Sequence, residues 1–109
     1  MGATRIIRKL TNEEYSALVH GRPMAINPHA LFRLASGQRK LFKESDLLDL
    51  LSYGRPLLVG VQHNERYSAF FPHGKGYIRI IFQINFNNHL EIGTFHITYR
   101  LPHLDYETN

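Results

Sequence analysis

The sequence predicts an α+β fold in which about three N-terminal helices pack on one face of a four-stranded antiparallel sheet. Helix-start signals occur in the first half of the chain, whereas residues 77–86 alternate between apolar and polar side chains as a half-buried strand does. Short turns separate the apolar segments that follow residue 56. Because strands joined by short turns pair antiparallel, the helices are left to cover one face of the sheet.

Two helices are expected in the first third of the chain. Thr11 and Glu14 have the spacing of a capping box, and the helix that they open should end at about His20. Asn27 and Pro28 provide a capping side chain and a favoured first helical residue. A second helix is therefore expected from residue 28 to about residue 35.

The third helix is expected from residue 43 or 44 to Tyr53, and Gly54 ends it. The apolar segments after it predict strands at residues 57–62, 66–71, 77–86 and 89–100. Asn87-Asn88 can adopt positive φ and close the last hairpin. We expect residues 1–109 to form one domain with a core at about 11–101, and residues 103–109 to fray.

Composition favours an anionic partner and argues against several kinds of chemistry. Thirteen Lys and Arg against nine Asp and Glu give a net charge of +4, which suits nucleic acid first and a membrane surface second. The absence of Cys excludes disulfides, thiolate catalysis and Cys-based zinc sites, and it is compatible with the cytoplasm, where we expect the protein. Since no two of the seven His have helical i, i+4 spacing, no metal or cofactor is expected.

The sheet face away from the helices is expected to carry the functional side chains. Arg79 and Gln83 point away from the apolar set of their strand. In the last strand the apolar residues before and after Gly93 have opposite parity, so we expect a β-bulge at Gly93. With this bulge, the polar face also includes Glu91, His96, Thr98 and Arg100, and Arg66 and Ser68 extend it.

Arginine and histidine side chains on one face suit a phosphodiester. Arginine binds nonbridging phosphate oxygens in a bidentate manner, and histidine can exchange a proton near neutral pH. Lys75 lies in a glycine-rich loop that could hold a phosphate through its backbone N–H groups or could be a plain hairpin loop. The alternative interpretation of the whole face is a solvated surface without a ligand.

His29 and Arg33 form a second candidate cluster, because their i, i+4 spacing puts both side chains on one face of a helix. The segment His29-Ala30-Leu31-Phe32-Arg33 resembles the His-Ala-x-x-Arg helix start of BrnT-like and phage-type toxin families. The resemblance spans about residues 27–100, although residues 36–43 lack the usual Arg-Gly-Ile step. These families belong to the barnase, EndoU, colicin and RelE group of metal-independent ribonucleases.

The resemblance implies a toxin-like endoribonuclease that cleaves RNA through a 2′,3′-cyclic phosphate. It assigns catalytic roles to His29 and Arg33 in the helix and to Thr98 and Tyr99 in the last strand. The polar face adds His96 as a catalytic residue. His29 or His96 would take the 2′-hydroxyl proton, and the other histidine or Tyr99 would protonate the leaving oxygen. The residues expected to bind RNA or phosphate are Arg66, Lys75, Arg79, Gln83 and Arg100.

Two alternatives to an enzyme stay open at this point. The same basic face could bind RNA without cleaving it, by stacking bases on aromatic side chains and holding phosphates. It could also dock a protein, such as an acidic antitoxin or immunity protein. RNA binding that survives loss of the histidines would indicate the first alternative, and binding of an acidic protein without RNA affinity would indicate the second.

Overall fold

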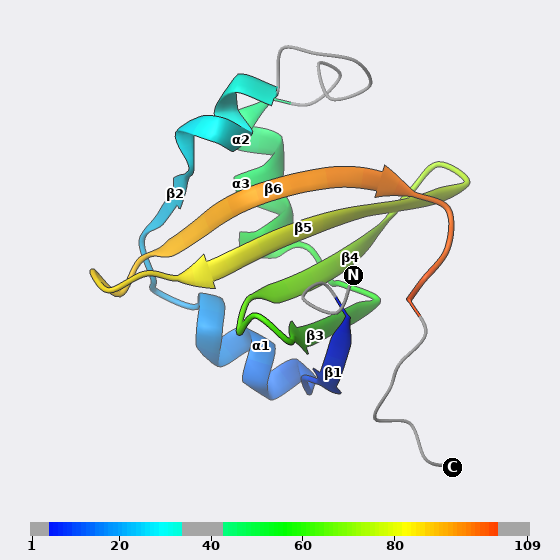
Figure 1. The fold of residues 1–109 in the computed structure, drawn as a ribbon, viewed down its shortest axis with the longest axis horizontal. Coiled ribbons are helices and arrows are strands. Elements are labelled where there is room, and N and C mark those ends of the chain that lie inside the picture. The colour runs from blue at the N-terminus through cyan, green and yellow to red at the C-terminus, as the bar shows by residue number, and fades with distance from the viewer. Residues whose placement is uncertain (1–4, 34–42, 103–109) are drawn as a thin grey trace.

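The computed structural model describes residues 5–33 and 43–102, with the backbone alone for residues 31–33. Three helices are present in this part of the chain: α1 (Asn12–Val19), α2 (Pro28–Arg33) and α3 (Glu44–Tyr53). The strands are β1 (Ile6–Lys9), β2 (Met24–Ile26), β3 (Leu58–Gln62), β4 (Tyr67–His73), β5 (Gly76–Ile84) and β6 (Leu90–Thr98) (Figure 1). The helix expected beyond residue 33 and the tail 103–109 lie outside the described residues.

The sheet corrects the predicted fold. Its strands follow the order β1-β3-β4-β5-β6-β2, so six strands are present where the sequence predicted four. It is also mixed, because β2 runs parallel to β6 while the other neighbours pair antiparallel. The prediction of three helices on a four-stranded antiparallel sheet is therefore wrong, and the fold is mostly sheet with short helices.

The two missed strands lie at the edges of the sheet. Residues 6–9 lack the apolar alternation of a strand, and β2 has three residues between two prolines. They form because the edges of β3 and β6 offer unpaired backbone groups. The Leu10 N–H donates to the Val59 carbonyl at 2.8 Å, and the Asn27 N–H donates to the Ile92 carbonyl at 2.8 Å. Pairing over such sequence distances leaves no signal in the local pattern.

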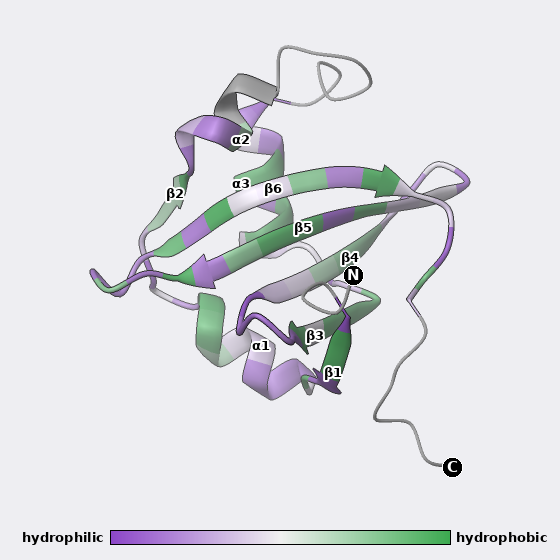
Figure 2. Ribbon diagram, in the orientation of Figure 1, coloured by the Kyte–Doolittle hydropathy of each residue, from purple (hydrophilic) through white to green (hydrophobic). Residues whose placement is uncertain are grey.

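The main hydrophobic core lies between the sheet and the pair α1 and α3. Tyr15 from α1 and Leu47 and Leu51 from α3 are buried against the even-numbered residues of β5, such as Ile80 and Phe82. The Tyr15 hydroxyl also donates a 2.8 Å hydrogen bond to the Leu51 carbonyl, which joins the two helices. Hydrophobic and hydrophilic residues alternate along the strands as this one-sided burial requires (Figure 2).

The predicted helix starts of α1 and α2 are confirmed by their capping contacts. Thr11 Oγ1 accepts a hydrogen bond from the Glu14 N–H at 3.0 Å, and Glu14 Oε1 accepts one from the Thr11 N–H at 2.9 Å. At α2, Asn27 Oδ1 accepts a 2.8 Å hydrogen bond from the N–H of His29. These contacts satisfy N–H groups that have no partner within a helix.

A smaller apolar cluster lies on the other face of the sheet. It consists of Ile6, Leu58 and Phe70, from β1, β3 and β4, and each side chain is buried. Gly60 lets β1 approach β3 here, because a Cβ on this residue would overlap Ile6 Cγ2 and lie 3.2 Å from the Arg8 carbonyl oxygen. The edge strand β1 therefore depends on a glycine at position 60.

The substitution Gly60→Ala tests this close approach. We expect it to lower the free energy of unfolding by about 1–3 kcal/mol, the usual cost of overpacking a buried site. Urea denaturation measures the change. The matched control is Gly93→Ala in β6, whose Cβ would lie 3.7 Å from its nearest neighbour, the Ile81 carbonyl oxygen. Equal losses in the two variants would contradict the proposed role of Gly60.

Candidate functional site

The β-bulge at Gly93 determines which β6 side chains share a face with the polar side chains of β5. Ile81 lies opposite Thr94, whereas the next residue, Phe82, lies opposite Ile92. Gly93 is thus the extra residue, and the bulge predicted there is confirmed. The resulting face, hereafter the polar face, contains four cross-strand pairs: Tyr77 with Thr98, Arg79 with His96, Ile81 with Thr94, and Gln83 with Glu91.

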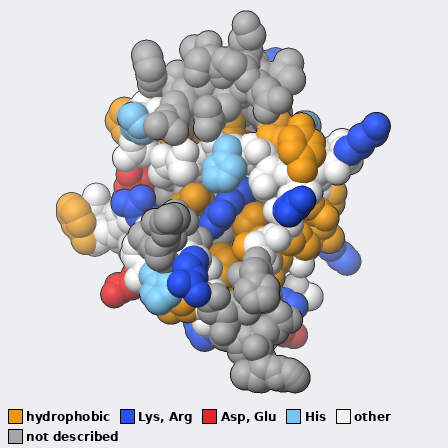
Figure 3. Space-filling view, turned by 45° about the vertical axis from the view of Figure 1, so that its right-hand side comes forward, with side chains coloured by type: hydrophobic (Ala, Val, Ile, Leu, Met, Phe, Trp, Pro, Cys, Tyr) orange, Lys and Arg blue, Asp and Glu red, His pale blue; other side chains and the backbone are white. Residues whose placement is uncertain are grey.

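Basic and histidine side chains are visible together on the surface of the molecule. A space-filling view, turned from that of Figure 1, shows a histidine beside a Lys or Arg side chain between hydrophobic groups (Figure 3). Acidic side chains in this view lie toward the margins (Figure 3). This distribution agrees with the net charge of +4 and favours anions over cations as ligands.

Arg79 is held across three strands by a largely buried polar network. Its Nε donates to Ser68 Oγ at 3.0 Å and its Nη2 donates to Gln62 Oε1 at 3.0 Å, while Ser68 Oγ donates to Gln62 Oε1. The guanidinium also lies 5.1 Å from the centre of the Phe70 ring. Burial lowers the pKa of Arg79, but an arginine keeps its charge in such a site. A positive charge is therefore fixed beside His96.

A hollow of about 190 Å³ lies further along the polar face. Three segments meet there: the start of α2, the turn between β3 and β4, and the bulge in β6 with the part of β5 opposite it. Three ionisable side chains line it, each from a different segment: His29, Arg66 and Glu91. Asn27, Gln83 and Gly93 complete most of its wall. This polar hollow brings an imidazole, a guanidinium and a carboxylate to one place.

Glu91 is the anionic group of the polar hollow. Its two carboxylate oxygens accept hydrogen bonds from Asn27 Nδ2 at 2.9 Å and from Asn85 Nδ2 at 3.3 Å. These hydrogen bonds, with the charge of Arg66, lower the pKa of Glu91. Asn27 also caps the N–H of His29, so one side chain connects the carboxylate to the segment that carries the imidazole.

The predicted site residues at the end of β6 lie at increasing distances from the polar hollow. His96 is half-buried and lies three residues beyond Gly93, about 10 Å at the usual strand rise. Thr98 lies five residues beyond Gly93, about 17 Å, and its Oγ1 donates to the Arg100 carbonyl at 3.3 Å. Tyr99 follows it and is 65% exposed. The residues that line the polar hollow with His29 therefore include none of His96, Thr98 and Tyr99.

Two further predicted residues are placed as follows. Lys75 is exposed in the turn between β4 and β5, next to Gly74, whose φ is 57°. This turn lies beside the Thr98 end of β6, because Gly76 begins the β5 strand that pairs with it. Arg33 ends α2, and its side chain lies outside the described part of the chain.

The sequence did not assign a function to Asn27 or Glu91. The sequence predicts Asn27 as a helix cap alone and Glu91 as an acidic member of the polar face. The signal that links them is the parallel pairing of Ala25 with Glu91, which puts Asn27 two residues beyond that pair. Because no local pattern in the sequence predicts β2, this link could not be predicted.

Within residues 5–33 and 43–102, no three His, Cys, Asp or Glu side chains gather in a way that could hold a metal ion. None of the helices described is long and apolar enough to cross a bilayer.

Comparisons with protein-family models, with curated proteins and with solved structures find no match to this chain. The resemblance to BrnT-like and phage-type toxins therefore stays a prediction from the sequence.

The pH dependence of stability tests the contacts of Glu91. Its pKa is lower in the folded state, so its ionised form stabilises the fold above the ordinary glutamate pKa of about 4.3. This contribution is lost as the pH falls through the folded-state pKa. We expect Glu91→Gln to be less stable than the parent protein at pH 7, with a difference that shrinks toward pH 3.

Urea denaturation at pH 7, 5 and 3 measures this difference in the free energy of unfolding. Asn27→Ala removes the donor with the largest effect on Glu91, so it should reduce the same pH-dependent component. A difference between the parent and Glu91→Gln that is as large at pH 3 as at pH 7 would show that the carboxylate charge is not stabilised.

Proposed function

We propose that the protein is a metal-independent endoribonuclease whose reaction takes place at the polar hollow. The observation that supports this proposal is the meeting of Glu91, His29 and Arg66 from three separate segments around one small cavity. A carboxylate, an imidazole and a guanidinium supply the base, the acid and the phosphate ligand that cleavage of RNA requires. No other group is needed for the step.

The reaction begins with transfer of the 2′-hydroxyl proton to the Glu91 carboxylate. The 2′ oxygen attacks phosphorus, the bond from phosphorus to the 5′ oxygen breaks, and protonated His29 gives a proton to that oxygen. The products are a 2′,3′-cyclic phosphate and a free 5′-hydroxyl. Arg66 stabilises the charge on the nonbridging oxygens, which contributes a few kcal/mol in the transition state. The hydrogen bonds from Asn27 and Asn85 that lower the pKa of Glu91 also hold its carboxylate in place beside the hollow.

The general base in this proposal differs from the histidine that the sequence predicts. His29 keeps a role, whereas Glu91 takes the place of the second histidine, because it lines the hollow with His29. Arg79 and His96 form the next part of the polar face and would hold the phosphates of the flanking nucleotides. This line of phosphate-binding residues is extended by Lys75 and Arg100. The ring of Tyr77 beside them would stack on a base.

The second candidate function is RNA binding without cleavage. The fixed guanidinium of Arg79 favours RNA binding. Ser68 and Gln62 hold this group on the polar face, outside the hollow, where it can bind a phosphate. In both cases the ligand is RNA in the cytoplasm. An acidic antitoxin or immunity protein would neutralise either activity by covering the polar face.

Cleavage assays on His29→Ala and Glu91→Gln test the catalytic proposal. Each substitution should lower the rate of RNA cleavage by about 10²–10⁴-fold, the usual contribution of a proton-transfer group. RNA affinity should change little in His29→Ala, since Arg66 and Arg79 are retained. His63→Ala and Glu13→Gln are the matched controls, because both side chains are exposed and neither lines the hollow.

The purified protein is incubated with tRNA, mRNA and ribosome-bound RNA, and the new ends are analysed for 2′,3′-cyclic phosphate. The proposal is wrong if all three substrates stay intact, or if the two variants cleave as fast as the controls. Salt-sensitive RNA binding without cleavage would favour the second candidate function.

A further inference from the structure

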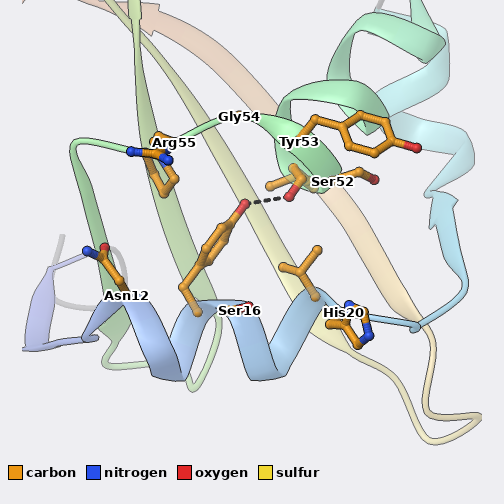
Figure 4. Close-up of a pocket in the computed structure, with 11 residues that line it drawn as sticks. Asn12, Ser16, His20, Ser52, Tyr53, Gly54 and Arg55 are labelled. Atoms are coloured by element: carbon orange, nitrogen blue, oxygen red, sulfur yellow. Dashed lines mark hydrogen bonds between the residues drawn. The ribbon is translucent and has the colours of Figure 1, made fainter.

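A second cavity lies on the helix side of the sheet, away from the polar hollow. It is a groove of about 640 Å³ between α1 and the end of α3, a volume that suits a small organic ligand. Tyr15 and Ser16 of α1 and the following His20 line one side. Ser52 and Tyr53 of α3 and the following Arg55 line the other (Figure 4). Hereafter this cavity is the helix groove.

Buried side chains form the floor of the helix groove. Val19, Leu51 and Tyr15 line the groove and are themselves buried. The Tyr15 hydroxyl donates to the Leu51 carbonyl at 2.8 Å, drawn as the dashed line in Figure 4. Because this hydroxyl already has an acceptor, Tyr15 offers a ligand mainly the surface of its ring.

The charged side chains of the helix groove are basic. Arg55 lies near Asn12 at one end, and His20 lies at the other end (Figure 4). Both are exposed, and no Asp or Glu of the described chain lines the groove. A groove of this size with an arginine at one end favours a ligand that carries a negative charge at one end.

The end of α3 provides the second feature that selects a ligand. Tyr53 is 84% exposed, so a large ring is displayed in water beside the groove. The last carbonyls of a helix accept no hydrogen bond from the helix itself. Of these, the Leu51 carbonyl accepts one from the Tyr15 hydroxyl. The carbonyls that follow it at the end of α3 favour a ligand ring with N–H donors.

We propose that the helix groove binds an aromatic anion of nucleoside monophosphate size. The ring packs against the exposed Tyr53, its N–H donors face the end of α3, and its phosphate pairs with Arg55. The inference is independent of the proposed ribonuclease activity, because the polar hollow is built from other residues on the other side of the sheet.

An NMR titration of ¹⁵N-labelled full-length protein tests the proposal, with 5′-AMP, adenosine and inorganic phosphate as probes. We expect AMP to shift the amides of Ser16, His20, Ser52 and Arg55, and to bind more tightly than adenosine or phosphate alone. Arg55→Ala should weaken AMP binding about fivefold, the upper value for an exposed ion pair, and leave adenosine binding unchanged. Lys43→Ala, at the other end of α3, is the charge-matched control.

A pair of variants on α1 tests the location. Ser16→Phe places a ring in the groove and should abolish AMP binding, whereas Ala17→Phe places the same ring on an exposed residue outside the lining and should not. His29→Ala and Glu91→Gln should bind AMP as the parent does, whatever their effect on RNA. The proposal is overturned if AMP shifts none of the groove amides, if Arg55→Ala and Ser16→Phe bind normally, or if the shifts map to the polar hollow.

Discussion

The β-bulge at Gly93 is the constraint on which both faces of the sheet depend. Leu90, Ile92 and Phe95 are all buried in the main core, although an uninterrupted strand would turn Phe95 away from the other two. One extra residue removes this conflict. The same shift brings Glu91 beside Gln83 on the polar face. In an uninterrupted ladder Glu91 would face the helix side, where a carboxylate would lose its hydration.

The polar hollow depends on a second feature, the short parallel strand β2. Its three residues pair with the start of β6 and end directly before Asn27. Asn27 then caps the N–H of His29 and donates to Glu91, so the edge strand, the helix start and the carboxylate are connected through one side chain. A strand of three residues thus positions the start of α2, with His29, beside Glu91. The proposed catalysis would therefore depend on β2, a strand that the sequence did not predict.

Local signals in the sequence predicted a large part of the structure, because they act over a few residues. The capping box at Thr11, the glycine bulge in β6 and the turn at Asn88, with φ of 67°, all have the predicted form. The membership of the polar face followed from side-chain parity. The edge strands did not, since their partners lie far away in the sequence.

The candidate site was predictable to a smaller degree. Parity put Arg79 and His96 on one face, but it gave no indication that Ser68 and Gln62 hold the guanidinium. The resemblance grouped Thr98 with His29, whereas the length of β6 separates Thr98 from the hollow. The distance of Thr98 along β6 can be counted from the sequence. It shows whether Thr98 can reach His29 only when the position of α2 relative to β6 is known.

The register of β5 and β6 is the most direct test of this account, and interstrand nuclear Overhauser contacts measure it. We expect backbone contacts between Ile81 and Thr94, between Phe82 and Ile92, and between Gln83 and Glu91, with no cross-strand partner for Gly93 on β5. Contacts that join Phe82 to Gly93 and Ile84 to Glu91 would contradict it. They would turn the carboxylate toward the helices and leave the polar hollow without its anionic group.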